Sequence, residues 1–281
     1  MFFFLFASVV AESIVETINN DPTSTWVAAE YPRSVINVAK FRAMLGAELG
    51  PHMPYVQPLS LSEPTEFDAR EQWPGKILPV RDQASCGSCW AHSVAEAMGD
   101  AQNIAGCPRG AMSVQDLVSC DKTDSACNGG DMKKAQEYLV KTGITTEACV
   151  KYVSGSGRVP ACPSKCDNGS QIIRYKLQSW KSVEPSEIMQ ALMEYGPLSC
   201  GFMVYSDFMN YRSGVYQHKS GYFEGGHAVL LCGWGVENGL PYWLVQNSWG
   251  PAWGEKGFFK ILRGSNHCEI ESYVTLGVPK C

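Results

Sequence analysis

Two cysteines stand three positions apart in residues 83–93, QASCGSCWAHS, with only a glycine and a serine between them. A cysteine thiol becomes a nucleophile when it ionises, and a helix N-terminus or a neighbouring imidazolium lowers its pKa. Between residues 89 and 104 apolar side chains recur every three or four positions, which predicts a helix that begins at or near Cys89. Cys89 is therefore a candidate nucleophile, although a cysteine near a helix start is more often packed or disulfide-bonded.

A thiol nucleophile needs a base, and the base needs a group that orients it. His227 stands in the run GGHAV (225–229), and Asn247 stands in QNSWG (246–250). A Cys–His–Asn set can work as a triad, because the imidazole ionises the thiol while the amide holds the imidazole in place. Each residue alone has a structural explanation, and their combination favours catalysis.

The segment QASCGSCW resembles the active-site segment of papain-like cysteine proteases. The runs CNGG (127–130), GGHAV and QNSWG follow in that family's order, and the resemblance covers essentially the whole chain. It is strongest toward cathepsin B, through FDAREQWP, VYSDF, SGVYQH, GWGVENG, PYWLV and GFFKILRG. It implies an α+β fold of two lobes, with a helical N-terminal lobe, a β-barrel-like C-terminal lobe and the active site in the cleft between them.

The resemblance also implies a role for individual residues. Cys89 would attack the scissile carbonyl, His227 would protonate the leaving amine, and Asn247 would orient His227. The Gln83 side chain and the Cys89 backbone N–H would form the oxyanion hole. The residues implied for substrate binding are Gly129, Gly130, Met132, Gly201, Gly226, Ala228, Trp249 and Tyr273, and Trp249 would also shield the His227–Asn247 hydrogen bond from water.

Twelve cysteines make disulfides the expected state of most of them. The resemblance implies the pairs Cys86–Cys127, Cys120–Cys162 and Cys149–Cys166, and the sequence leaves Cys107, Cys200, Cys232, Cys268 and Cys281 open. Because Cys89 stays free in this interpretation, parity requires at least one further unpaired thiol, and Cys268 is the candidate.

Two departures from cathepsin B bear on specificity. Cathepsin B has an insertion with two adjacent histidines that blocks one end of the cleft, whereas KYVSGSGRVPACPSK (151–165) contains no histidine. We therefore expect an open cleft and an endopeptidase. Tyr273 stands where cathepsin B has a carboxylate, which predicts an apolar S2 pocket and hydrophobic P2 residues. We expect His92, His218 and His267 to be structural, and His52 to lie in the pro-segment.

The chain divides into an expected signal peptide (1–11), an inhibitory propeptide (12–62) and a mature peptidase (63–281). The helical lobe would span mostly 80–195 and the β-rich lobe mostly 196–281. Prolines between 51 and 64 indicate an exposed linker, with cleavage near 58–64. By resemblance, Leu45 and Gly46 would cross the cleft in the direction opposite to a substrate. Further helices are expected at 14–19, 37–49, 113–119 and 132–141, and Asn238-Gly239 predicts a hairpin between two strands.

The composition limits the partners. The chain has 23 basic and 28 acidic residues without a basic stripe, which argues against nucleic acid. The cysteine content favours the secretory pathway, in a lysosome-like vacuole or outside the cell. We expect a monomer that acts on proteins or peptides, with its own propeptide as inhibitor, no membrane span, no cofactor and no metal, and with possible glycosylation at Asn168. Three rival interpretations are a Cys86–Cys89 oxidoreductase, an inactive protein of the same fold and a structural zinc site.

Overall fold

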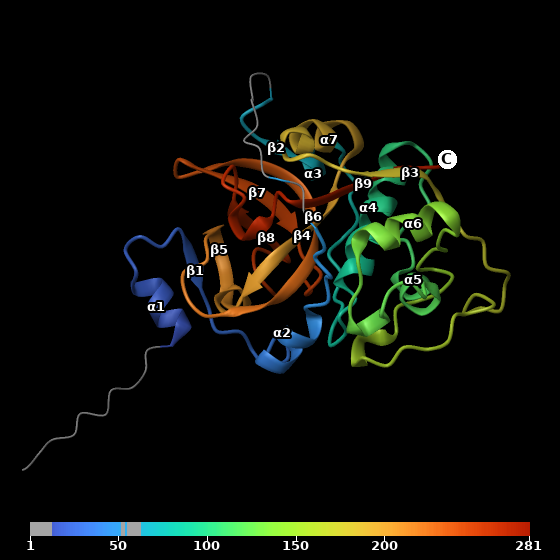
Figure 1. Ribbon diagram of the computed structural model, residues 1–281, viewed down its shortest axis with the longest axis horizontal. Helices are drawn as coiled ribbons and strands as arrows, with labels where there is room; N and C mark the ends of the chain where they lie inside the picture. The colour runs from blue at the N-terminus through green and yellow to red at the C-terminus, as the bar shows by residue number, and fades with distance from the viewer. Residues whose placement is uncertain (1–12, 52–53, 55–62) are drawn as a thin grey trace, which may run out of the picture.

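The computed structural model describes residues 13–51, 54 and 63–281. The expected signal peptide, His52 and most of the expected cleavage region lie outside these residues. A helical lobe and a β-rich lobe lie side by side, and the N-terminal segment runs along the β-rich lobe and then between the two lobes (Figure 1). No helix in the described ranges is long and apolar enough to cross a membrane.

The helices are short apart from one. They are α1 (Ile14–Asn20), α2 (Val38–Met44), α3 (Ala69–Gln72), α4 (Cys89–Ile104), α5 (Val114–Cys120), α6 (Met132–Lys141) and α7 (Ile188–Tyr195). Single 3₁₀ turns occur at Ala126–Asn128, Ser154–Ser156, Pro185–Glu187, Ser206–Asn210 and His267–Glu269. Side-chain caps explain several starts: Ser113 accepts a hydrogen bond from the backbone of α5, and Asp131 accepts one from the backbone of α6.

Helix α2 is shorter than the helix expected at 37–49. It ends at Met44, and Leu45 takes an extended backbone (φ −81°, ψ 97°). The residues that follow make their backbone hydrogen bonds to the two lobes instead of to α2, as with Gly46, whose carbonyl accepts from Gly130. Tertiary contacts therefore override a local helical pattern.

The strands form one sheet that branches once. They are β1 (Trp26–Ala28), β2 (Phe67–Asp68), β3 (Leu177–Ser182), β4 (Leu198–Tyr205), β5 (Tyr211–Tyr216), β6 (Phe223–Glu237), β7 (Leu240–Gln246), β8 (Phe258–Leu262) and β9 (Tyr273–Pro279). Their order is β1-β5-β8-β7-β6-β4-β9-β3, with β2 on β6. The end strands β1 and β3 do not pair with each other, so the β-rich lobe of the expected α+β fold contains an open sheet and not a closed barrel. The predicted turn is present, with φ 50° at Asn238 and φ 80° at Gly239.

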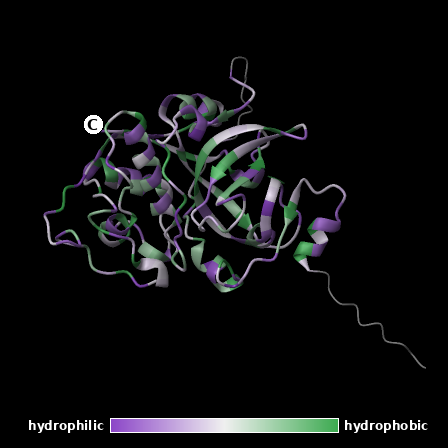
Figure 2. Cartoon of the chain, turned by 180° about the vertical axis from the view of Figure 1, so that it is seen from behind, coloured by the Kyte–Doolittle hydropathy of each residue, from purple (hydrophilic) through white to green (hydrophobic). Residues whose placement is uncertain are grey.

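The two lobes have separate cores. The β-rich lobe buries a cluster of aromatic rings around Phe208, and Figure 2 shows apolar residues along its strands. The helical lobe buries its apolar side chains around α4, in which every residue from Cys89 to Asn103 is buried. Helix α4 packs against β6 and β9 as well as against α5 and α6. Its first residue is therefore held at the boundary between the lobes.

Four disulfides stabilise the chain. The three pairs implied by the resemblance are present, and Cys107 bonds Cys281 across 174 positions. The cysteines left free are Cys89, Cys200, Cys232 and Cys268. Parity therefore gave the right minimum, and Cys268 is indeed unpaired, together with two deeply buried cysteines that the sequence left open.

Candidate active site

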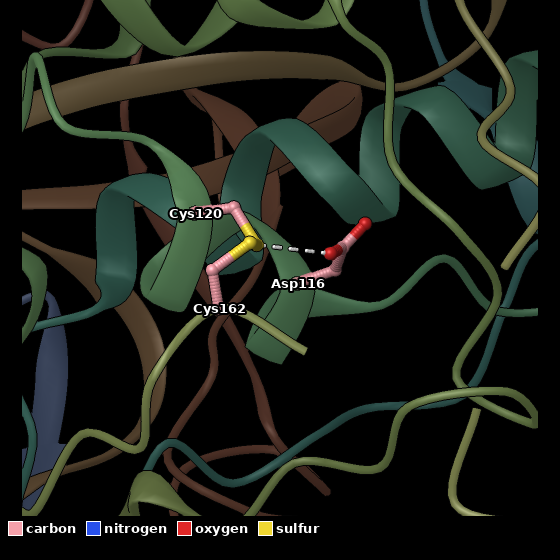
Figure 3. A group of neighbouring side chains, drawn as sticks. All are labelled: Asp116, Cys120 and Cys162. Atoms are coloured by element: carbon pink, nitrogen blue, oxygen red, sulfur yellow. Dashed lines mark hydrogen bonds between the residues drawn. A yellow bond between two sulfur atoms is a disulfide. The ribbon is translucent and has the colours of Figure 1, made fainter. Parts of the chain in front are cut away.

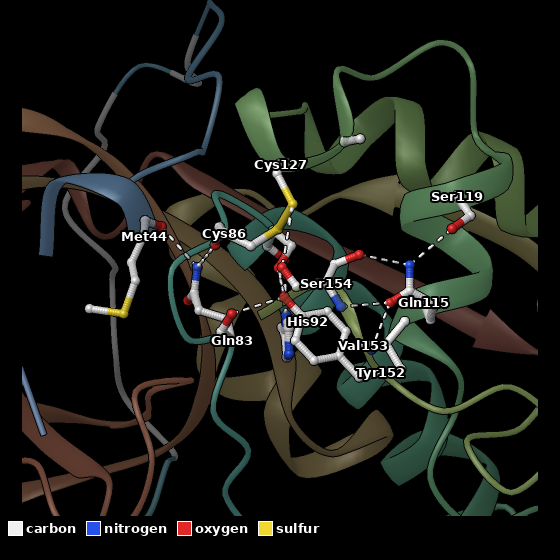
Figure 4. The surroundings of a disulfide bond; sticks show 12 residues. Met44, Gln83, Cys86, His92, Gln115, Ser119, Cys127, Tyr152, Val153 and Ser154 are labelled. Carbon is white, nitrogen blue, oxygen red and sulfur yellow. Dashed lines mark hydrogen bonds between the residues drawn. A yellow bond between two sulfur atoms is a disulfide. The ribbon is translucent and has the colours of Figure 1, made fainter. Parts of the chain in front are cut away.

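The two cysteines of the opening motif differ in their bonding: one forms a disulfide and the other is free. Cys86 is bonded to Cys127, which anchors the loop before α4 (Figure 4). Cys89 is free, fully buried, and the first residue of α4. At this position the thiol lies at the N-terminus of the helix, where the free N–H groups of the first turn favour a negative charge. A Cys86–Cys89 oxidoreductase is incompatible with this pairing.

His227 and Asn247 come together because β6 and β7 are antiparallel neighbours. His227 Nε2 lies 2.8 Å from Asn247 Oδ1, and the backbone N–H of Ser248 also donates to that oxygen at 2.8 Å. The oxygen is therefore an acceptor, so Nε2 carries the proton. Nδ1 then keeps its lone pair, and it has no hydrogen-bond partner in the described chain. This tautomer leaves Nδ1 able to take a proton from a thiol.

The Cys89 sulfur lies against the peptide that follows His227. The backbone N–H groups of Ala228 and Gly46 both donate toward it. Burial raises the pKa of the Cys89 thiol to about 11, and burial lowers the pKa of His227 to about 4. We call this structure, in which the N-terminal segment covers the site, the closed form. In the closed form the thiol and the imidazole are therefore both neutral at pH 7.

Gln83 is buried and its amide is fixed from both sides. Its Oε1 accepts from the Ser248 hydroxyl at 2.6 Å, so its Nε2 is the donor. Nε2 donates to the Cys86 carbonyl at 2.8 Å and to the Met44 carbonyl at 2.9 Å (Figure 4). A carbonyl oxygen of the N-terminal segment thus lies where an oxyanion would accept the same N–H. The sequence indicated Gln83, but it gave no signal for Met44, which meets Gln83 through its backbone carbonyl while its side chain is buried in the core of the β-rich lobe.

The N-terminal segment pairs with the walls of the cleft through its backbone. Gly130 donates to the Gly46 carbonyl at 2.9 Å, and Glu48 donates to the Gly130 carbonyl at 2.9 Å. Ala47 donates to the Gly226 carbonyl at 3.1 Å. The pairing of Ala47 with Gly130 is parallel. Gly130 and Gly226, both expected to bind a substrate backbone, therefore bind this segment.

Leu49 lies among the residues expected to form the S2 pocket. A Cβ on Gly201 would lie 2.6 Å from Leu49, 2.9 Å from Met132 and 3.3 Å from Tyr273. A Cβ on Gly226 would also meet Leu49. Leu49 packs against the cluster that contains Ala228. The expected pocket residues are thus neighbours, and the residue in their midst is Leu49, which the sequence did not single out.

The remaining predicted residues lie close by. The Trp249 ring is buried, 4.9 Å from the His227 ring, and so covers it. Leu45 lies beside Gly225, and Gly129 (φ 123°) faces the Gly46 carbonyl. The Tyr273 hydroxyl donates to Glu269 at 2.8 Å, which adds a carboxylate near the pocket that the sequence reasoning missed.

The other histidines lie outside this arrangement. His92 packs edge-on against Tyr152, 4.9 Å away, and its Nδ1 contacts Ser88. Burial lowers the pKa of His92 to about 3, so it stays neutral. His218 Nδ1 lies 3.2 Å from Oδ1 of the buried Asp207, and the backbone N–H of His218 donates to His267 Nε2.

One cluster among the described residues has the composition of a metal site. Asp116, Cys120 and Cys162 lie within 4.8 Å of one another (Figure 3). The two sulfur atoms are bonded to each other, and the Arg174 guanidinium occupies the carboxylate at 2.8 Å. Without free thiolates this cluster does not fit the expected chemistry of zinc.

Comparison with known proteins agrees with the fold. The profile of "Papain family cysteine protease" matches residues 63–278. The chain therefore belongs to the papain family of cysteine proteases.

Within the family it is similar to cathepsin B-like enzymes. It is 46% identical to "Cathepsin B-like CP2" of Giardia intestinalis over 76% of this chain and 74% of that protein. It is 37% identical to "Cathepsin B-like cysteine proteinase 4" of Caenorhabditis elegans over 96% and 92%. The solved structure "proCathepsin B S9 from Trypanosoma congolense" superposes with a TM-score of 0.86 at 32% identity, covering 98% of this chain and 100% of that one.

Proposed function

We propose that this chain is a cysteine endopeptidase made as a zymogen. His227 Nδ1 takes the proton of Cys89, and the thiolate attacks the scissile carbonyl. The oxyanion accepts hydrogen bonds from Gln83 Nε2 and the Cys89 backbone N–H. His227 then protonates the leaving amine, and water hydrolyses the thioester. The observation that carries this proposal is the free Cys89 beside the oriented His227–Asn247 pair.

The segment 12–62 is the inhibitory propeptide in this proposal. Supporting observations are its backbone pairing along the cleft and the Met44 carbonyl on Gln83. Cleavage near 58–64 would release it. The four disulfides fit an oxidising compartment of the secretory pathway, and the exposed Asn168 is available to a glycan.

Peptides with a hydrophobic residue at P2 are the expected substrates, because Leu49 already lies among Met132, Gly201 and Tyr273. An endopeptidase is favoured by the segment between Cys149 and Cys166. Its Tyr152 hydroxyl contacts Ser88 at 2.9 Å and the Gln83 carbonyl at 2.9 Å, so this segment is tied to the helical lobe. It contains no histidine that would bind a terminal carboxylate.

The proposal is tested with purified zymogen that is activated and then treated with an epoxysuccinyl inhibitor. Mass spectrometry should find the label on Cys89 and the segment up to about residue 62 removed. Internally quenched peptides should be cut internally, and P2 Leu should exceed P2 Arg in kcat/KM. The Cys89→Ala variant is the matched control and should cut none of them.

Three results would count against the proposal. Labelling of another cysteine would remove Cys89 as nucleophile. Release of C-terminal dipeptides as the main activity would contradict the endopeptidase. A higher kcat/KM for P2 Arg than for P2 Leu would contradict the pocket assignment alone.

A further inference from the structure

Glu224 lies on β6, three positions before His227. The pairing of β6 with β4 shifts here: Val204 faces Gly225 and Tyr205 faces Phe223, so Glu224 has no partner on β4. Such a β-bulge inserts one extra residue into a strand and changes the direction of its side chain, and bulges are common beside active sites. The Glu224 carboxylate is thereby turned out of the regular ladder of β6.

The carboxylate is held by one residue of the enzyme body and bound by one residue of the propeptide. The Ser206 hydroxyl donates to Glu224 Oε1 at 2.8 Å. Arg42 of α2 donates from Nε to Oε2 at 2.8 Å and from its terminal nitrogen to Oε1 at 3.2 Å. The side chain of Glu224 is only 13% exposed, while that of Arg42 is 62% exposed. This two-point geometry is the typical fork between a guanidinium and a carboxylate.

Within the described residues, Arg42 is the cation that pairs with Glu224. Its hydrogen bonds are the largest cause of the lowered pKa of Glu224. When the propeptide leaves, Glu224 keeps the Ser206 hydroxyl but loses its cation. A carboxylate already held in position then lies uncovered in the active-site cleft.

The position of the Met44 carbonyl shows on which side of the cleft this carboxylate lies. That carbonyl accepts from Gln83, so it marks the site of reaction. Residues after Met44 run along Gly130 to the pocket around Leu49, the unprimed side in the proposed function. Arg42 precedes Met44 and therefore lies on the opposite, primed side. At about 3.3 Å per extended residue, Glu224 is about 10 Å along β6 from His227, within reach of an arginine in the first two primed positions.

We propose that Glu224, held by Ser206, is a specificity-determining residue that binds the side chain of an arginine at P1′ or P2′ of the substrate. The inference rests on the proposed function and adds a charge requirement to it. The propeptide residue Arg42 occupies this subsite in the zymogen.

The test uses the activated enzyme and peptides with one unprimed half, carrying P2 Leu, and with Arg, Leu or Glu at P1′ or at P2′. The expected ratio of kcat/KM for Arg over Leu is roughly tenfold at the better position, between the effect of an exposed ion pair and that of a buried charged hydrogen bond. The ratio should decline with added salt. Glu224→Gln should bring it near one, and Glu224→Lys should favour the Glu peptide.

Glu187→Gln is the matched control, because Glu187 lies in the Pro185–Glu187 turn, where it pairs with Lys181. It should keep the ratio of the wild type. Ser206→Ala provides a second variant if Glu224→Gln does not fold, and it should lower the ratio in part. An active wild type without arginine preference, or an unchanged ratio in Glu224→Gln, overturns the inference alone. A wild type that cuts no peptide refutes the proposed function and the inference with it.

Discussion

Replacing Gly46 by alanine should open the closed form. The new Cβ would lie 2.1 Å from the carbonyl oxygen of Gly87, 2.6 Å from its carbonyl carbon and 2.7 Å from its Cα. All three are backbone atoms, and Gly87 is itself held by a 2.9 Å hydrogen bond to the Cys127 carbonyl. The loop of Gly87 cannot move aside, so the propeptide must move.

The cost follows from the contacts that must be released. Moving Gly46 strains or breaks the hydrogen bonds that join Met44, Gly46, Ala47 and Glu48 to the enzyme body. At about 1 kcal/mol for each of four bonds, with partial relaxation, the closed form loses about 3 kcal/mol. Because about 1.4 kcal/mol corresponds to a factor of ten, the open fraction should rise about 100-fold.

The assay is the rate at which an epoxysuccinyl inhibitor labels Cys89 in the full-length zymogen at neutral pH. Gly50→Ala is the matched control, because a Cβ at Gly50 would have only the Asp131 carboxylate within 4 Å, at 4.0 Å. Equal labelling rates in Gly46→Ala and the wild type would refute the steric reasoning. A similar acceleration in Gly50→Ala would show that the added methyl group acts through the local chain and not through Gly87.

Three further predictions concern pH and catalysis. Burial lowers the pKa of His227 from 6.5 to about 4, and Arg42 lowers the pKa of Glu224, so in acid both groups take up protons when the closed form opens. The closed form should therefore keep its stability above pH 6.5 and lose it progressively toward pH 4 and below. The thermal midpoint of a Cys89→Ala zymogen measures this stability, and a midpoint that rises on acidification contradicts the prediction. Gln83→Ala should lower kcat about 100-fold with little change in KM, because an oxyanion donor is lost; an equal rise in KM instead would indicate a role in substrate binding. Asn247→Ala should lower kcat by about 100-fold, because His227 loses the acceptor that fixes its tautomer, and unchanged steady-state kinetics would exclude that role.

More of the candidate site than of the surrounding fold could be predicted from the sequence. Helix α4 was predictable because its apolar period and its start at Cys89 are local properties. The extended chain after Met44 was not, because FRAMLGAEL has a helical pattern and its conformation depends on Gly130 and Gly226, far along the chain. The pairing of Cys107 with Cys281 and the open order of the strands are likewise set by contacts between distant segments.

The geometry of the closed form also explains how a peptide can fill this cleft without reacting. In the proposed mechanism, attack requires one peptide unit to place its carbonyl oxygen on Gln83 and its carbonyl carbon at the Cys89 sulfur. Here the carbonyl on Gln83 belongs to Met44, whereas the group that faces the sulfur is the N–H of Gly46, two residues further along. A donor N–H is no electrophile, and this N–H belongs to a different peptide unit from the Met44 carbonyl, in a segment that pairs in parallel with Gly130. Reversal of the chain direction therefore separates oxyanion-hole occupancy from nucleophilic attack.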